Sequence, residues 1–283
     1  MSVKKSIALV TGASSGIGKA TAERLVNAGY KVYGTSRRGG KQDSSSFEML
    51  ALDVTRDESV AAAVNELLRR EGRIDLLVNN AGFGVAPAGA EESSIEQAHA
   101  IFETNFFGIV RMTRAVLPQM RKQGSGRIVN IGSILGLLPM PYGALYSATK
   151  HAVEGYSESL DHEVRTRGIR VSVVEPAFTR TAFDANLMEP DTMLDEYRGN
   201  RAGMNQLMVE SIAKGDDPAV VADVVLLAAS AAHPKLRYTA GSLAGRLRFL
   251  RRFAPAALVD AGIRKDFRLD APATPARASA AAK

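Results

Sequence analysis

A short apolar run followed at once by closely spaced glycines constrains the fold more than any other feature of this sequence. The run covers residues 7–10 (Ile-Ala-Leu-Val), and the glycines lie within residues 11–18 (Thr-Gly-Ala-Ser-Ser-Gly-Ile-Gly). Residues 19–29 then carry apolar side chains at the spacing of a buried helix face, and residues 31–36 resume a β-rich pattern. The segment predicts a strand, a glycine turn, a helix and a second strand in succession.

The same alternation continues along the chain. Further strands are expected at 47–54, 75–79, 126–133, 169–175 and 237–240, and helices at 57–71, 94–122, 144–167 and 218–232. The second of these helices carries possible bend points at Gly108 and Pro118, and Asp217 is a candidate N-cap of the last. Strands that alternate with helices favour a parallel sheet covered on both faces. We therefore predict an α/β fold, a single doubly wound Rossmann domain with ligands beyond the carboxyl ends of its strands.

Length and composition favour one domain with a sizeable core. The 283 residues are 46% hydrophobic and 23% charged, which excludes a disordered chain. We expect the domain to span 1–270, with a substrate lid at about 179–215 and a C-terminal helical extension at about 243–268. Residues 271–283 are mostly Ala, Pro, Ser and Arg and are predicted to form a disordered tail.

Several classes of protein are disfavoured by composition. The chain has no cysteine, which excludes disulfides and thiolate metal sites, and its four scattered histidines lack metal-ligand spacing. No signal peptide or apolar run of membrane-spanning length is present, so we expect a cytoplasmic protein. The net charge of +6 is concentrated in residues 246–268, which do not form a recognisable nucleic-acid-binding module.

The glycines Gly12, Gly16 and Gly18 predict a nucleotide site. Glycines between a strand and a helix let the backbone approach a pyrophosphate and present the N–H groups of the helix terminus to it. A tight turn without a ligand is the alternative, and the predicted β-α-β context disfavours it.

The end of the second predicted strand indicates which dinucleotide fits. An acidic residue there would bind the ribose 2′-hydroxyl and repel a 2′-phosphate, but this chain has Ser36 followed by Arg37. A guanidinium suits bidentate binding of phosphate, so NADP(H) is favoured over NAD(H). A solvated turn is the competing interpretation, and it fits Arg38 better than Arg37.

Tyr146 and Lys150 lie four residues apart on a predicted helix, so their side chains share one face. A nearby ammonium stabilises a phenolate and lowers the pKa of tyrosine, which makes such a pair a proton donor and acceptor. Taken alone, the spacing fits a structural pair better.

Together, these motifs resemble the short-chain dehydrogenase/reductase family. The matching residues are 11–18, 79–82 (Asn-Asn-Ala-Gly), Ser133, Tyr146 and Lys150, in the expected order and spacing. The resemblance covers roughly residues 3–240 and implies hydride transfer between NAD(P)(H) and an alcohol/carbonyl pair. The C-terminal extension is similar to the subgroup of 17β-hydroxysteroid and retinol dehydrogenases, which by analogy implies a steroid, retinoid or lipid-like carbonyl.

The resemblance also implies roles for four residues. Tyr146 would protonate the carbonyl oxygen, and Lys150 would lower the pKa of Tyr146 and hold the nicotinamide ribose. Ser133 would hydrogen-bond the reacting oxygen, and Asn105 would hold a water that relays protons to Lys150.

The implied cofactor-binding residues are Gly12, Ser14, Ser15, Gly16, Ile17, Gly18, Ser36, Arg37, Asp53, Val54, Asn80, Ala81, Gly82, Tyr146, Lys150, Pro176, Phe178 and Thr181. Among them, Asp53 and Val54 fall where the family contacts the adenine ring. One departure is Ala177, which follows Pro176 where the family usually has glycine. Alanine is a small change if its φ is negative and a strained one if its φ is positive.

A mostly apolar wall is expected for the substrate, which suggests a hydrophobic ketone or secondary alcohol. Its candidates are Phe83, Val85, Leu135, Leu137, Leu138, Met140, Tyr142, Phe183, Leu187 and Met188, of which at least half are expected to belong to the core. The extension mixes arginines with apolar residues at helical intervals. We favour a helix pair that closes the pocket over an interfacial membrane helix, because Pro255 interrupts the pattern.

These observations predict an NADP(H)-dependent oxidoreductase that interconverts a hydrophobic ketone or aldehyde and an alcohol, without a metal. The alternatives are a non-catalytic NADP(H)-binding regulator and a membrane-surface lipid or retinoid reductase. By resemblance, the helices that contain Asn105 and Lys150 imply a homo-oligomer, either a dimer or a tetramer. The sequence leaves the substrate and the direction of the reaction open.

Overall fold

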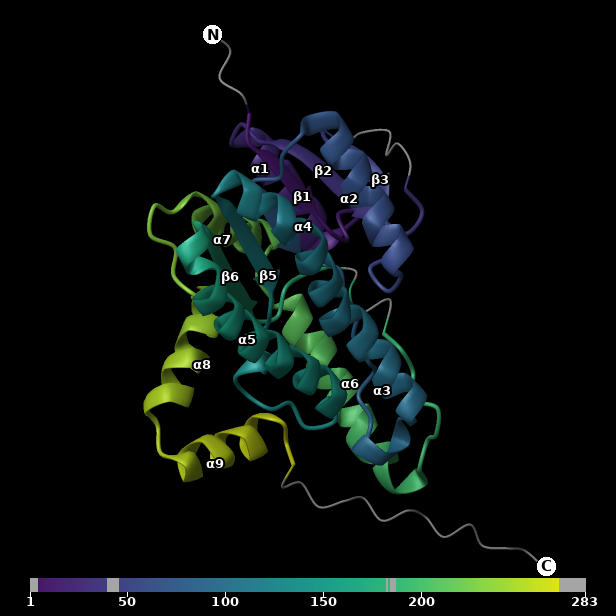
Figure 1. The fold of residues 1–283 in the computed structure, drawn as a ribbon. Coiled ribbons are helices and arrows are strands. Elements are labelled where there is room, and N and C mark those ends of the chain that lie inside the picture. The colour runs from purple at the N-terminus through teal and green to yellow at the C-terminus, as the bar shows by residue number, and fades with distance from the viewer. Residues whose placement is uncertain (1–4, 40–45, 182, 184–186, 270–283) are drawn as a thin grey trace, which may run out of the picture.

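The computed structural model describes residues 5–39, 46–181, 183 and 187–269, so the tail predicted at 271–283 lies outside the described residues. Within them, seven parallel strands form one sheet in the order β3-β2-β1-β4-β5-β6-β7 (Figure 1). The strands are β1 (Ile7–Val10), β2 (Lys31–Ser36), β3 (Glu48–Ala51), β4 (Leu76–Asn79), β5 (Gly126–Ile131), β6 (Ile169–Pro176) and β7 (Arg237–Ala240). The predicted doubly wound α/β fold is confirmed.

Helices cover both faces of this sheet. They are α1 (Gly16–Asn27), α2 (Asp57–Glu71), α3 (Ile95–Phe102), α4 (Gly108–Gln123), α5 (Ala144–Val164), α6 (Arg198–Ala213), α7 (Pro218–Ser230), α8 (Ser242–Phe253) and α9 (Ala256–Asp266). Buried side chains of α2, α4 and α5 share one hydrophobic cluster with the sheet, and those of α1 and α7 share the other. Because both faces are covered, β1 and β4 are buried along their whole length, which explains the continuous apolar sequence of β1 and of residues 76–78 in β4.

The helix expected at 94–122 is interrupted by a π-helical turn, Glu103–Phe107, which separates α3 from α4. Gly108 follows the turn at a close packing point, since a Cβ there would lie 2.8 Å from Cγ2 of Val54. Pro118 lies inside α4. π-turns often occur at functional sites, and this one carries Asn105.

Helix α7 begins as the sequence predicts. The carboxylate of Asp217 accepts a hydrogen bond of 2.9 Å from the N–H of Ala219, and Pro218 occupies the first turn. This cap fixes the start of a helix that packs against α1.

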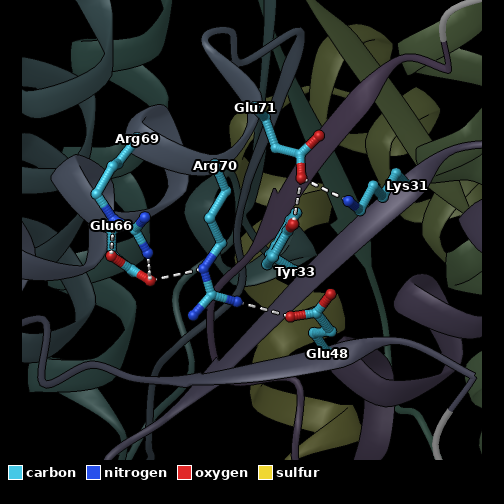
Figure 2. A network of polar contacts seen from close by, with 7 residues as sticks. All are labelled: Lys31, Tyr33, Glu48, Glu66, Arg69, Arg70 and Glu71. Atoms are coloured by element: carbon cyan, nitrogen blue, oxygen red, sulfur yellow. Dashed lines mark hydrogen bonds and ion pairs between the residues drawn. The ribbon is translucent and has the colours of Figure 1, made fainter.

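An ion-pair network ties α2 to the outer strands (Figure 2). Glu71 accepts from Lys31 and from the hydroxyl of Tyr33, both at 2.5 Å. Arg70 bridges Glu66 at 2.6 Å and Glu48 at 2.7 Å. Most of these charges are partly exposed, so the network orients α2 against β2 and β3 more than it stabilises the fold.

The C-terminal segment forms two helices, α8 and α9, which meet near Pro255 and extend beyond the sheet at the lower left of Figure 1. The break that Pro255 predicts is therefore present. Among the described residues, none of the helices has the length and apolar character needed to span a bilayer.

Candidate active site

A cleft of about 1150 Å³ opens at the carboxyl ends of the central strands. Of the predicted site residues, all but Gly18 line it. The glycine turn, the end of β2, the segment after β4 and the residues on α5 come from distant parts of the sequence. Parallel strands bring them together because their carboxyl ends share one edge of the sheet.

The glycine turn has the shape that a pyrophosphate site requires. Gly12 and Gly16 adopt positive φ values of 65° and 54°, which favour glycine. A Cβ on Gly18 would lie 2.2 Å from the carbonyl oxygen of Gly12, so Gly18 serves close packing of α1 against the turn. The first turn of α1 has no acidic residue, and the side chain of Ser15 makes no capping hydrogen bond. The helix N-terminus thus presents N–H groups and a positive dipole end to the cleft.

Thr11 and Asn80 hold the glycine turn in place. The hydroxyl of Thr11 accepts hydrogen bonds from the N–H groups of Asn80 at 2.9 Å and Ala81 at 3.0 Å. The amide of Asn80 donates to the carbonyl oxygens of Thr11 and Gly12, each at 3.0 Å. The structure therefore assigns the side chain of Asn80 a supporting role within the protein, which the sequence pattern did not reveal.

Ser36 and Arg37 line the cleft at the end of β2, close to Asp53. Asp53 accepts from the N–H and the hydroxyl of Thr55 at 3.0 and 2.7 Å. Partial burial opposes ionisation of Asp53, but these hydrogen bonds and the charge of Arg37 lower its pKa overall. Asp53 is therefore ionised at neutral pH and orders the adjacent loop.

Tyr146 and Ser133 form a hydrogen-bonded couple in the wall of the cleft. The hydroxyl oxygen of Ser133 also accepts from the N–H of Leu135 at 3.1 Å, which fixes its orientation. Burial raises the pKa of Tyr146 to about 12, and the hydrogen bond with Ser133 opposes this rise. Tyr146 is consequently a protonated hydroxyl in the protein without cofactor.

Lys150 lies next to Tyr146, with its Nζ 5.6 Å from the centre of the tyrosine ring. That Nζ donates a hydrogen bond of 2.9 Å to the carbonyl oxygen of Ile131. Burial lowers the pKa of Lys150 to about 8, although the charge of Glu154 opposes the fall. Desolvation is the largest cause of both pKa shifts in the protein without cofactor, and a lowering of the Tyr146 pKa by Lys150 stays a prediction.

Asn105 reaches the cleft from the π-turn and is buried. Its Oδ1 accepts from the N–H of Phe83 at 3.0 Å, and its Nδ2 donates to the carbonyl oxygen of Phe83 at 2.8 Å. The side-chain amide thereby fixes the segment that follows β4. A water relay from Asn105 to Lys150 stays a prediction.

The segment after β6 crosses over the glycine turn. A Cβ on Gly16 would lie 3.3 Å from the side chain of Thr181, so the two segments are in near contact. Ala177 does not have a positive φ, since the described non-glycine residues that do are Tyr142 and Arg268. Replacement of the usual glycine by alanine therefore introduces no backbone strain.

Most of the residues predicted for the substrate wall line the cleft. Leu137, Tyr142 and Met188 do not line the cleft, whereas the other seven do. Met188 instead pairs its backbone with the segment around Val85, and the ring of Tyr142 packs against Tyr197 at 6.2 Å between centroids. The ring of Phe183 packs edge-on to Tyr146 at 6.0 Å.

Three helices complete this wall with residues that the sequence analysis did not identify. These are Leu207, Met208, Ser211 and Ile212 of α6, Leu243 and Leu247 of α8, and Ile263, Asp266 and Phe267 at the end of α9. Most are apolar, and within each helix they are adjacent or lie three to five residues apart, the spacing of one helix face. The sequence shows this helical spacing, but it does not show which surface the apolar face of each helix packs against.

The doubly wound sheet and the cleft at its carboxyl edge define a dinucleotide-binding fold. A family model described as short chain dehydrogenase matches residues 6–192, and the chain belongs to this oxidoreductase family. The chain is 39% identical over 239 residues to a 3-ketodihydrosphingosine reductase of Bacteroides thetaiotaomicron, covering 84% of this chain and 88% of that protein. It is 36% identical over 259 residues to human 17-beta-hydroxysteroid dehydrogenase type 1, covering 83% and 77% respectively.

Solved structures show the same architecture. A short-chain dehydrogenase from Streptomyces avermitilis superposes with a TM-score of 0.80 at 35% identity, covering 95% of this chain and 98% of that one. A Burkholderia phymatum relative in complex with NAD has a TM-score of 0.76 at 26% identity, covering 89% and 95%. A Burkholderia cenocepacia relative in complex with NADP has a TM-score of 0.73 at 26% identity, covering 92% and 98%. Structural neighbours thus bind either dinucleotide.

Proposed function

We propose that the chain is an NADP(H)-dependent oxidoreductase that interconverts a hydrophobic ketone or aldehyde and the corresponding alcohol. One observation carries the proposal. A single cleft places the hydrogen-bonded couple of Tyr146 and Ser133, with Lys150 beside it, next to a glycine turn shaped for a pyrophosphate. An acid with an orienting partner and a dinucleotide site are what carbonyl reduction requires.

In this proposal the dinucleotide supplies the hydride, and the protein supplies position and the proton. Ser133 donates a hydrogen bond to the substrate carbonyl, which polarises the carbonyl and aims it at Tyr146. Tyr146, protonated in the free protein, gives its hydroxyl proton to the oxygen as negative charge develops there. Lys150 then stabilises the phenolate that remains, and its charge is present below a pKa of about 8.

The preference for NADP(H) rests on Ser36 and Arg37. Both line the cleft, and neither can repel a 2′-phosphate as an acid at the end of β2 would. The double variant Ser36→Asp with Arg37→Ile is expected to move the preference toward NAD(H), measured as the ratio of kcat/KM values. An unchanged ratio would refute this assignment.

The apolar wall favours a substrate with a long hydrocarbon part. Leu207, Leu247 and Phe267 extend the cleft across α6, α8 and α9, away from the glycine turn. The similar Bacteroides protein is a 3-ketodihydrosphingosine reductase, which supports a lipid-like ketone. We propose reduction of such a ketone as the reaction.

NADPH oxidation against a panel of ketones and aldehydes of increasing chain length tests this function. A rise in kcat/KM with chain length is expected, because each buried methylene contributes about 0.8 kcal/mol. Tight NADPH binding without turnover of any panel member would instead favour the non-catalytic regulator.

A membrane-surface reductase is a second candidate, because the outer side of the C-terminal helices exposes apolar and basic residues together. Phe249 and Phe253 are 63% and 67% exposed, and α8 contains Arg251 and Arg252 but no acidic residue. Flotation with liposomes that contain anionic lipid tests it, and protein that stays at the bottom of the gradient removes this candidate. A homo-oligomeric state and a cytoplasmic location stay predictions.

A further inference from the structure

A group of charged side chains lies beside Lys150 and takes no part in the reaction proposed above. Arg237 of β7 contacts Glu154 of α5 at 2.8 Å, Glu158 of α5 at 2.9 Å and Glu175 of β6 at 3.6 Å. Arg248 of α8 lies 3.7 Å from the other carboxylate oxygen of Glu175. Four elements therefore meet at one charged cluster.

Two carboxyl groups of this cluster are buried, which lowers the stability of the fold when they are ionised. Glu154 and Glu175 are 5% and 0% exposed, and one oxygen of Glu154 and both oxygens of Glu175 lack a hydrogen-bond partner among the described residues. Burial and the charge of Glu154 raise the pKa of Glu175 to about 7, while Arg248 and Arg237 oppose the rise. Buried polar groups without hydrogen bonds are rare in proteins and call for an explanation.

Glu154 is placed against two parts of the proposed active site. It follows Lys150 by one helical turn, so both side chains share a face of α5. A Cβ on Gly132 would lie 3.0 Å from Oε1 of Glu154, and one on Gly136 would lie 2.9 Å from its Cγ. The two glycines flank Ser133 and leave the space that the Glu154 side chain fills. The charge of Glu154 also opposes the fall in the pKa of Lys150 that burial causes.

We propose that Glu154 is a positioning residue for Lys150, held by Arg237 and linked through Glu175 and Arg248 to helix α8. Its carboxylate keeps the lysine ammonium charged in a site that otherwise desolvates it. This inference rests on the proposed function, because it gives Glu154 a role only through Lys150.

The cluster also connects the substrate wall to the lysine. Helix α8 packs on β7 and contributes Leu243 and Leu247 to the cleft, while its Arg248 reaches Glu175. Burial raises the pKa of both Glu154 and Glu175, and the charge of Arg248 opposes this rise. Helix α8, which lines the cleft, is thus joined through Glu175 and Arg237 to Glu154, one helical turn from Lys150.

Titration of Lys150 in Glu154→Gln tests the proposal directly. The full-length protein is labelled with ¹³C at lysine Cε, and the Lys150 resonance is assigned by its absence in Lys150→Arg. We expect the pKa of Lys150 to fall by about one pH unit, because a nearby opposite charge is removed. Glu154→Asp keeps the carboxylate, so the pKa of Lys150 in this variant should stay close to its value in the unmodified protein. Glu158→Gln is the matched control, since Glu158 shares Arg237 but is half exposed and lies two turns from Lys150, and it should leave the titration unchanged.

Glu154→Met keeps the test open if Glu154→Gln fails to fold, because methionine fills a similar volume and buries no unpaired amide. This variant should lower the pKa of Lys150 by a similar amount, since it removes the same negative charge. Where turnover is measurable, the alkaline limb of the kcat profile for reduction should move to lower pH in parallel, with KM nearly constant. An unchanged Lys150 titration in the folded variants overturns the proposal. Absence of turnover in the unmodified protein defeats the proposed function alone, because the titration does not depend on turnover.

Discussion

Replacement of Glu175 by glutamine should make the protein more stable at alkaline pH and not at acidic pH. Burial raises the pKa of this carboxyl from 4.5 to about 7, so the folded state holds its proton more tightly than the unfolded chain. Ionisation of Glu175 therefore costs stability as the pH rises from about 4.5 to about 7, and the full cost persists above that range. Glutamine has nearly the same shape and carries no charge at any pH.

The size of the effect follows from the pKa difference. The step from 4.5 to about 7 corresponds to about 3 kcal/mol, since each pH unit is worth about 1.4 kcal/mol. This figure is an upper bound, because Arg237 and Arg248 each lose an ion-pair partner in the variant. At pH 5 the two proteins should be nearly equal in stability, and at pH 8.5 Glu175→Gln should gain up to about 3 kcal/mol.

Urea denaturation of both proteins at pH 5, 6, 7 and 8.5, followed by circular dichroism, measures this difference. Glu158→Gln is the control, because hydrogen bonding and the charge of Arg237 lower the pKa of the Glu158 carboxyl. Loss of that carboxylate should cost a little stability at every pH of this series, because the Glu158 carboxyl is ionised throughout it. A constant stability difference between Glu175→Gln and the unmodified protein across the pH range would refute the argument.

Two further predictions concern the fold around the site. Gly18→Ala places a Cβ 2.2 Å from the carbonyl oxygen of Gly12. We expect urea denaturation to show a loss of about 1–3 kcal/mol in stability, and fluorescence titration to show at least tenfold weaker NADPH binding. Unaltered NADPH affinity would contradict the role given to the glycine turn. Asp161→Asn removes a fully buried carboxylate that accepts hydrogen bonds from Arg165, Arg170 and the N–H of Val171. Urea denaturation should show a free energy of unfolding lower by about 3 kcal/mol, and a loss under about 1 kcal/mol would contradict this prediction.

The sheet was predictable from sequence because its strands and helices are dictated by local patterns. The continuous apolar run of β1, the positive-φ glycines and the aspartate that caps α7 each act within a few residues. The residues of the cleft were predictable for a related reason, since every strand end of a parallel sheet meets at one edge.

The remainder depends on contacts between distant segments, which local patterns do not encode. The apolar faces of α6, α8 and α9 have helical spacing, but only the folded chain shows that they wall the cleft. The bonding of Asn80 to the glycine turn spans 68 residues, and Arg237 lies 83 residues from Glu154. The protonated state of Tyr146 likewise follows from burial, which the spacing to Lys150 does not reveal.

The proposed role of Tyr146 is tested most directly by NADPH oxidation with a long-chain ketone, comparing the unmodified protein with Tyr146→Phe. Phenylalanine keeps the ring that packs against Phe183 and removes only the hydroxyl. We expect kcat to fall by at least about 100-fold, because a positioned general acid contributes 10²–10⁴-fold, while NADPH affinity stays within about threefold. A Tyr146→Phe protein that turns over at nearly the unmodified rate would contradict the mechanism.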